Sequence, residues 1–78
     1  MLNHPFVQMQ TRVLLQRDEL KVNEPTEKVQ QLHRIIYGRQ ADAEEIRIAR
    51  QFVDSAGPTA WEQYTQALLM ANEFAFVD

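Results

Sequence analysis

The chain has 78 residues, of which 45% are hydrophobic and 24% charged, and its formal net charge is −3. This length suits a single domain, residues 1–78, and the composition is that of an ordinary globular protein. Without cysteine there are no disulfides or thiolate metal sites, and the mild acidity argues against binding to a phosphate backbone, which needs clustered Lys and Arg.

Two glycines and three prolines divide the chain into four stretches of helical length, each with helical rather than strand periodicity. The first helix is predicted to begin at Pro5, because proline suits the first helical position. It is predicted to end before Pro25, since the residue preceding a proline avoids the helical conformation. Its predicted inner face consists of Phe6, Met9, Val13 and Leu20, with Leu14 beside them.

The second helix is predicted from about Pro25 to Tyr37, and Gly38 is a natural left-handed terminator. For the third helix, Asp42 and Glu45 have the spacing of a capping box. The inner positions predicted for these two helices are Val29, Leu32, Ile36, Ile46, Ala49, Phe52, Val53 and Ala56.

The fourth helix is predicted to begin after Thr59 and to end near Asn72–Phe74, with residues 75–77 as an extended tail. Its inner row should be Trp61, Tyr64, Leu68 and Ala71. Together these elements predict an all-α protein, a small four-helix domain that is either bundle-like or orthogonal.

Few side chains suggest chemistry. His33 lies beside apolar neighbours in the second helix, which predicts a hydrogen-bonded histidine at the edge of the core rather than a catalytic or metal-binding one. The acidic residues Asp42, Glu44 and Glu45 lack the spacing of a calcium loop and are expected to stabilise a helix N-terminus. We therefore expect no catalytic residue, no cofactor and no metal.

The partners expected from composition are equally limited. The nearest approach to a basic patch is Arg34, Arg39, Arg47 and Arg50, but Glu44 is placed to pair with Arg47. We expect no nucleic-acid binding, because the aromatic residues are also predicted to lie in the core rather than exposed for stacking on bases. No apolar run reaches the roughly 18–20 residues that span a bilayer, so no membrane insertion is expected.

Four short motifs occur in one order along nearly the whole chain. They are the opening Leu2-Asn3-His4-Pro5-Phe6-Val7, Tyr37-Gly38-Arg39, the acidic start of the third helix, and Leu68-Leu69-Met70-Ala71-Asn72-Glu73-Phe74. In these motifs the chain resembles the closing segment of domain-of-unknown-function family 1553, a planctomycete surface domain of large exported proteins that often accompanies a cytochrome-like module. Gln40 and Ala71 depart from the family pattern. The resemblance implies a C-terminal fragment of a larger exported protein, any haem belonging to a separate module, and no established activity.

Two residues in these motifs suggest a structural ion pair. Arg39 is predicted to pair with Glu73 at the end of the fourth helix, or else with Glu45. Phe74 and Phe76 are candidates for docking, because two residues that alternate in an extended tail cannot both face the core. One of them should contact a neighbouring domain or fold back over the helices.

Two classes of function stay open at this point. The first is a non-catalytic docking or structural module that closes the larger exported protein, contacts its other domains and is a monomer in isolation. The second is an accessory wall of an enzyme site formed mainly by upstream domains, acting on polysaccharide or in electron transfer. A docking module should expose an apolar patch, whereas an enzyme wall should bring polar residues together in a cleft. A third class, an autonomous ligand-binding domain, needs a large apolar pocket, which so small a core can hardly provide.

Overall fold

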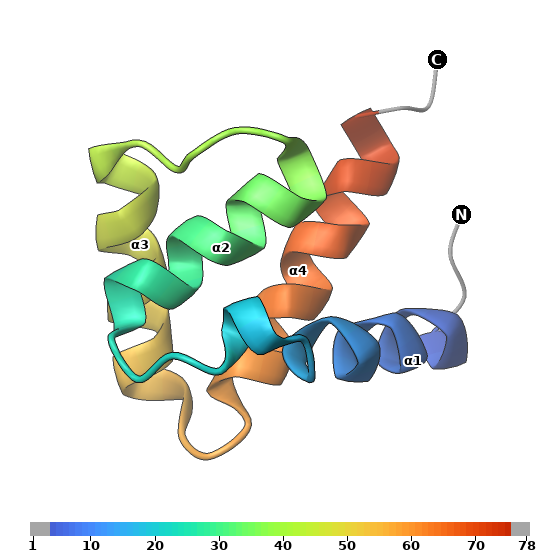
Figure 1. The fold of residues 1–78 in the computed structure, drawn as a ribbon. Coiled ribbons are helices and arrows are strands. Elements are labelled where there is room, and N and C mark those ends of the chain that lie inside the picture. The colour runs from blue at the N-terminus through green and yellow to red at the C-terminus, as the bar shows by residue number, and fades with distance from the viewer. Residues whose placement is uncertain (1–3, 76–78) are drawn as a thin grey trace.

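A computed structural model describes the backbone of residues 4–75 and the side chains of residues 5–72. In this part of the chain the elements are α1 (His4–Leu15), the short 3-10 helix η1 (Asp18–Leu20), α2 (Pro25–Tyr37), α3 (Ala43–Ala56) and α4 (Ala60–Ala75). The predicted all-α class is confirmed. Helices α2 and α3 pack beside α4, and α1 crosses α4 at a steep angle (Figure 1).

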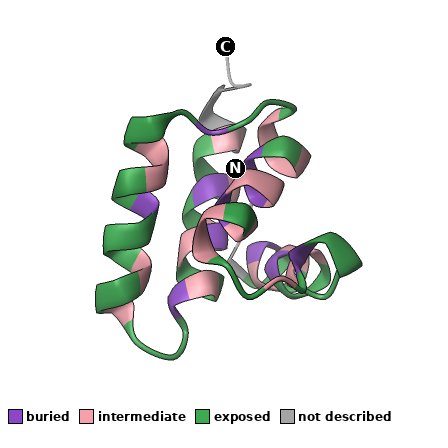
Figure 2. Cartoon of the chain, turned by 60° about the vertical axis from the view of Figure 1, so that its left-hand side comes forward, coloured by how far each residue is buried: buried purple, intermediate pink, exposed green. Residues whose placement is uncertain are grey.

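The core lies where α2, α3 and α4 meet. One cluster of buried side chains is formed by Leu20, Leu32 and Leu68, and a second by Val29, Ala41 and Ala49. Trp61 and Tyr64 of α4 pack against both clusters and so connect them. The buried positions face the interior of the helical assembly, and the outward face of α3 is almost entirely exposed (Figure 2).

The prediction for the first helix is wrong in its length. Helix α1 ends at Leu15, and the chain then turns at Gln16 and Arg17 before η1. This turn brings Leu20 into the core, where it is almost completely buried. The sequence has no glycine or proline at this turn, so the break depends on the tertiary packing of Leu20 rather than on a local signal.

The predicted inner face of the first helix is wrong for Phe6, Met9 and Val13, whereas Leu20 is buried as predicted. Val7 and Thr11 are the buried residues of α1, whereas Phe6, Met9 and Val13 are 41%, 47% and 57% exposed. Thr11 tolerates burial because its hydroxyl donates a hydrogen bond to the carbonyl of Val7 at 2.8 Å. The apolar side chains of α1 lie on more than one of its faces, so the sequence pattern does not show which face packs against α4.

Helices α2 and α3 have the bounds that their local signals predict. The carboxylate of Glu24 accepts hydrogen bonds from the backbone N–H groups of Thr26 and Glu27, both at 3.1 Å. Gly38 ends α2 in the left-handed conformation, with φ 75°. The capping box of Asp42 and Glu45 is present at the start of α3. These interactions satisfy backbone groups that a helix end leaves without partners.

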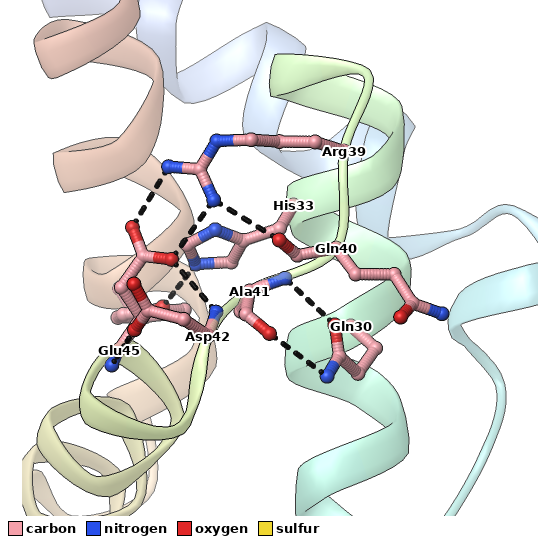
Figure 3. A network of polar contacts seen from close by, with 8 residues as sticks. Gln30, His33, Arg39, Gln40, Ala41, Asp42 and Glu45 are labelled. Atoms are coloured by element: carbon pink, nitrogen blue, oxygen red, sulfur yellow. Dashed lines mark hydrogen bonds and ion pairs between the residues drawn. The ribbon is translucent and has the colours of Figure 1, made fainter.

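The loop between α2 and α3 is held against α2 by one side chain. The amide of Gln30 donates to the carbonyl of Ala41 at 3.2 Å and accepts from the N–H of Ala41 at 2.8 Å (Figure 3). These two hydrogen bonds resemble those between paired backbone segments, and they hold the loop in place just before α3. The loop therefore carries Arg39 to a defined position above the N-terminus of α3.

The C-terminal prediction needs one correction. Helix α4 continues to Ala75, so Phe74 lies in its last turn as predicted, and Ala75, which was assigned to the extended tail, is helical. The premise that Phe74 and Phe76 alternate in an extended segment therefore does not hold for Phe74. Phe76 lies outside the described residues, as does the side chain of Phe74.

Candidate functional site

An open pocket is formed by side chains of α2, α3 and α4 together with Arg39 of the loop after α2. Its volume is about 560 Å³. Part of its wall is polar and part is apolar. It is lined by His33, Tyr37, Arg39, Glu45, Ile48, Tyr64, Leu68 and Ala71. The pocket is open to the surface and only partly apolar, so it differs from the large apolar pocket that so small a core can hardly provide.

His33 and Tyr64 form the buried polar contact of this pocket. His33 is 2% exposed, and its Nε2 lies 2.8 Å from the hydroxyl oxygen of Tyr64 on α4. Burial lowers the pKa of His33 and raises the pKa of Tyr64 to about 12. Both groups are therefore uncharged at neutral pH. The prediction of a hydrogen-bonded histidine is confirmed, although the side chain is more deeply buried than its place at a core edge suggested.

Tyr37 lies one helical turn after His33 and extends the same wall. Their rings meet edge to face with centroids 5.3 Å apart. The hydroxyl of Tyr37 donates a hydrogen bond to the backbone carbonyl of Leu68 at 3.0 Å. Burial is the main cause that raises the pKa of Tyr37, so this phenol too is uncharged at neutral pH.

Arg39 and Glu45 form the charged edge of the pocket. Two nitrogens of the guanidinium each donate to one carboxylate oxygen of Glu45, both at 3.0 Å. The carboxylate also accepts from the N–H of Asp42 at 2.9 Å, and these contacts appear together in Figure 3. The hydrogen bonds from Arg39 and Asp42 lower the pKa of Glu45 to about 2.

The structure therefore places Arg39 against Glu45, the second of the two partners predicted for it. The side chain of Glu73, the first, lies outside the described residues. Because Glu45 belongs at once to the capping box and to the ion pair, the loop after Gly38 is joined to the first turn of α3. The pair orders the pocket edge rather than the C-terminal helix end.

A second candidate surface is the outer row of α1, which we define as Phe6, Met9 and Val13. These residues lie within about 60° of one another on a helix that turns 100° per residue, away from the buried Val7 and Thr11. The helix carries no acidic residue in its first turn, and Arg12 lies near its C-terminal end. The outer row is an exposed apolar strip on the helix that crosses α4.

The other charged side chains among residues 5–72 form isolated contacts rather than a binding cluster. Glu44 pairs with Arg47, as the spacing predicted, and Arg50 donates to the hydroxyl of Thr26 at 3.2 Å. Within the described residues, no three His, Asp or Glu side chains are grouped so that they could hold a metal ion. Among the same residues, no helix has the length and apolar character needed to cross a membrane.

Sequence reasoning missed five residues of the pocket wall: Tyr37, Ile48, Tyr64, Leu68 and Ala71. The last three were predicted as the inner row of the fourth helix, and Ile48 lies beside the predicted stripe of α3. The one available signal was the spacing of His33 and Tyr37, which places two side chains with polar tips on one face of α2. Their partner on α4 cannot be found from that spacing.

Chemically, the site is suited to recognition. His33, Tyr37 and Tyr64 are neutral hydrogen-bonding groups, and Arg39 and Glu45 neutralise each other. Comparison with protein-family models, curated proteins and solved structures found no match to this chain. The described residues thus form a small all-α fold that carries this mixed pocket and the exposed apolar strip of α1.

Proposed function

We propose that this chain is a non-catalytic helical docking module of a larger protein. The observation that supports it is the outer row of α1. Met9 and Val13 are about half exposed on a helix whose opposite face is already packed against α4. A helix that presents apolar side chains on two faces is suited to contact two surfaces, one within its own domain and one beyond it.

The docking partner is another domain of the same larger protein. A contact within one chain needs little intrinsic affinity, because the linkage raises the effective concentration of the two surfaces. A strip of three apolar residues is consistent with such a contact. The resemblance to exported planctomycete-type proteins suggests the setting, which would place the module at the end of an exported or cell-surface protein.

Hydrogen exchange tests this proposal. In the longer protein, the amides of α1 should exchange more slowly than in the isolated chain, and the double variant Met9→Gln, Val13→Gln should remove the difference. Met70→Gln is the matched control, because Met70 is also exposed but belongs to α4 rather than to the outer row of α1. Equal exchange of α1 in both contexts would contradict docking through this helix.

The pocket favours a second candidate function, an accessory wall of an enzyme site formed mainly by other domains. Polar side chains of α2, α3 and α4 converge there, which is the arrangement expected for such a wall. If this candidate holds, Tyr37→Phe should lower the activity of the complete enzyme while the double variant of the outer row leaves it unchanged. The docking function predicts the opposite result: the double variant of the outer row should weaken assembly, and Tyr37→Phe should not.

A further inference from the structure

The protonation of His33 determines what its pocket offers to a ligand. Its Nδ1 is buried and has no hydrogen-bond partner among residues 5–72. A neutral imidazole carries one hydrogen, and a buried unpaired N–H is rarer in proteins than an unpaired acceptor. The imidazole also lies beside the Arg39–Glu45 pair (Figure 3). The hydrogen is therefore assigned to Nε2.

This tautomer leaves the Tyr64 hydroxyl hydrogen available. The Nε2–H of His33 donates to the phenolic oxygen of Tyr64, so the hydrogen of Tyr64 itself points elsewhere. Tyr64 lines the pocket. Tyr37 has the complementary role, because it uses its hydrogen on the carbonyl of Leu68 and keeps lone pairs on its oxygen. One wall thus contains a donor and an acceptor, both uncharged.

The rest of the pocket selects against charge and favours an apolar body. The Arg39 and Glu45 side chains are joined by two hydrogen bonds, so a charged ligand would have to compete with an existing ion pair. The apolar part of the lining consists of Leu68, Ala71 and Ile48, the last of which is 52% exposed. A volume of about 560 Å³ falls within the roughly 300–1,000 Å³ of small-molecule sites.

We infer that this pocket binds a small uncharged ligand that carries a carboxamide or an equivalent pair of acceptor and donor on an apolar ring. The carbonyl of the ligand accepts from the Tyr64 hydroxyl, its N–H group donates to the Tyr37 oxygen, and its ring packs on Ile48, Leu68 and Ala71. This inference is independent of docking through α1, because the outer row contributes no residue to the pocket.

The test uses benzamide as the probe and benzoate as its charged counterpart, titrated into the full chain at millimolar concentrations. In two-dimensional NMR spectra, benzamide should shift the signals of Ile48, Leu68 and Tyr64. Benzoate should bind at least about fivefold more weakly than benzamide. Tyr64→Phe keeps the ring and removes the hydroxyl, so benzamide should bind about fivefold more weakly, as expected for one lost hydrogen bond. Absence of shifts at these residues, or tighter binding of benzoate, would overturn the inference.

A second pair of variants covers the case in which Tyr64→Phe, by leaving His33 without its partner, fails to fold. Ala71→Phe adds a ring inside the pocket at an exposed position, whereas Ala67→Phe adds the same ring at an exposed position of α4 that does not line it. Benzamide binding should be lost in Ala71→Phe and kept in Ala67→Phe. Equal binding by these two variants would overturn the inference.

Discussion

Glu45 combines three contacts in a single carboxylate. It accepts two hydrogen bonds from Arg39 and one from the backbone of Asp42, and it lines the pocket. Because the first two groups belong to the loop and the carboxylate belongs to α3, their contacts fix the loop relative to the helix. The charge of Glu45 should therefore contribute to the free energy of unfolding.

The pH dependence of this contribution follows from the direction of the shift. The pKa of Glu45 is lowered from 4.5 to about 2, so its stabilising effect is complete above 4.5 and is lost as the pH falls towards 2. Glu45→Gln should reduce stability by about 1 kcal/mol at neutral pH and flatten the acid limb of the stability curve. Urea unfolding followed by circular dichroism at several pH values measures both effects. Glu44→Gln, which alters an exposed pair, should change little.

His33 should produce a second dependence on pH. Burial lowers its pKa below 6.5, so the unfolded chain binds a proton more readily than the folded chain as the pH falls through 6.5. Stability from the neutral imidazole is therefore present above 6.5 and declines below it. NMR titration of the imidazole C–H signal should give a folded-state pKa below that of the same residue in urea. A titration at or above 6.5 would contradict the burial of this side chain.

The two helix-ending glycines differ in what can replace them. Gly38 has φ 75° and ψ 14°, a left-handed conformation that asparagine also adopts. Gly57 has φ 84° and ψ −157°, a region open almost only to glycine. No atom lies within 4 Å of a side-chain carbon added at either position, so backbone conformation alone decides the outcome.

We expect Gly38→Asn to lower the free energy of unfolding by about 1 kcal/mol or less, and Gly57→Asn by about 2–3 kcal/mol. Chemical unfolding of the two variants measures the difference. Equal losses would show that the conformation at Gly57 relaxes without cost.

Helix α1 offers a matched test of its two faces. Val7 is buried and Val13 is exposed on the same helix, so the same substitution probes both. Val7→Ala should cost about 1.5–2.5 kcal/mol because buried methyl groups are removed, whereas Val13→Ala should change stability by less than about 0.5 kcal/mol. Thermal unfolding of the two variants distinguishes them. If Val13→Ala is as costly as Val7→Ala, the assignment of the outer row is wrong.

The described part of the molecule has a small core, with eight buried hydrophobic residues, among them Val29, Leu32 and Ala49. A domain of this size buries only about 60% of the surface that its unfolded chain exposes, so its stability should be modest. Contact with a second surface through α1 would add to it. The free chain is nevertheless held together by its own packing and helix caps.

Thermal unfolding at two protein concentrations tests whether the complete chain folds alone as a monomer. We expect one cooperative transition with the same midpoint at both concentrations, as for a monomer that folds alone. A midpoint that rises with concentration would mean that a second copy covers an exposed surface, and repeating the experiment with Met9→Gln, Val13→Gln would show whether that surface is the outer row.

Features that depend on neighbouring residues in the chain could be predicted from the sequence. Pro25 and Gly38 bound α2, and the capping box of Asp42 and Glu45 starts α3, because a helix end is decided by the backbone groups and side chains within one turn. The all-α class follows from the same local signals. For His33, apolar neighbours were sufficient to predict a hydrogen bond, though not its partner.

Only the tertiary structure decided which face of α1 is buried, where that helix ends and what lines the pocket. Helix α1 is apolar on more than one face, so the choice of Val7 and Thr11 depends on how α4 fits against it. The contact of His33 with Tyr64 and that of Tyr37 with Leu68 each join α2 to a distant part of the chain. Such contacts form only when helices pack, and the packing angle of two helices is set by the shapes of both surfaces together, which the residues of neither helix specify alone.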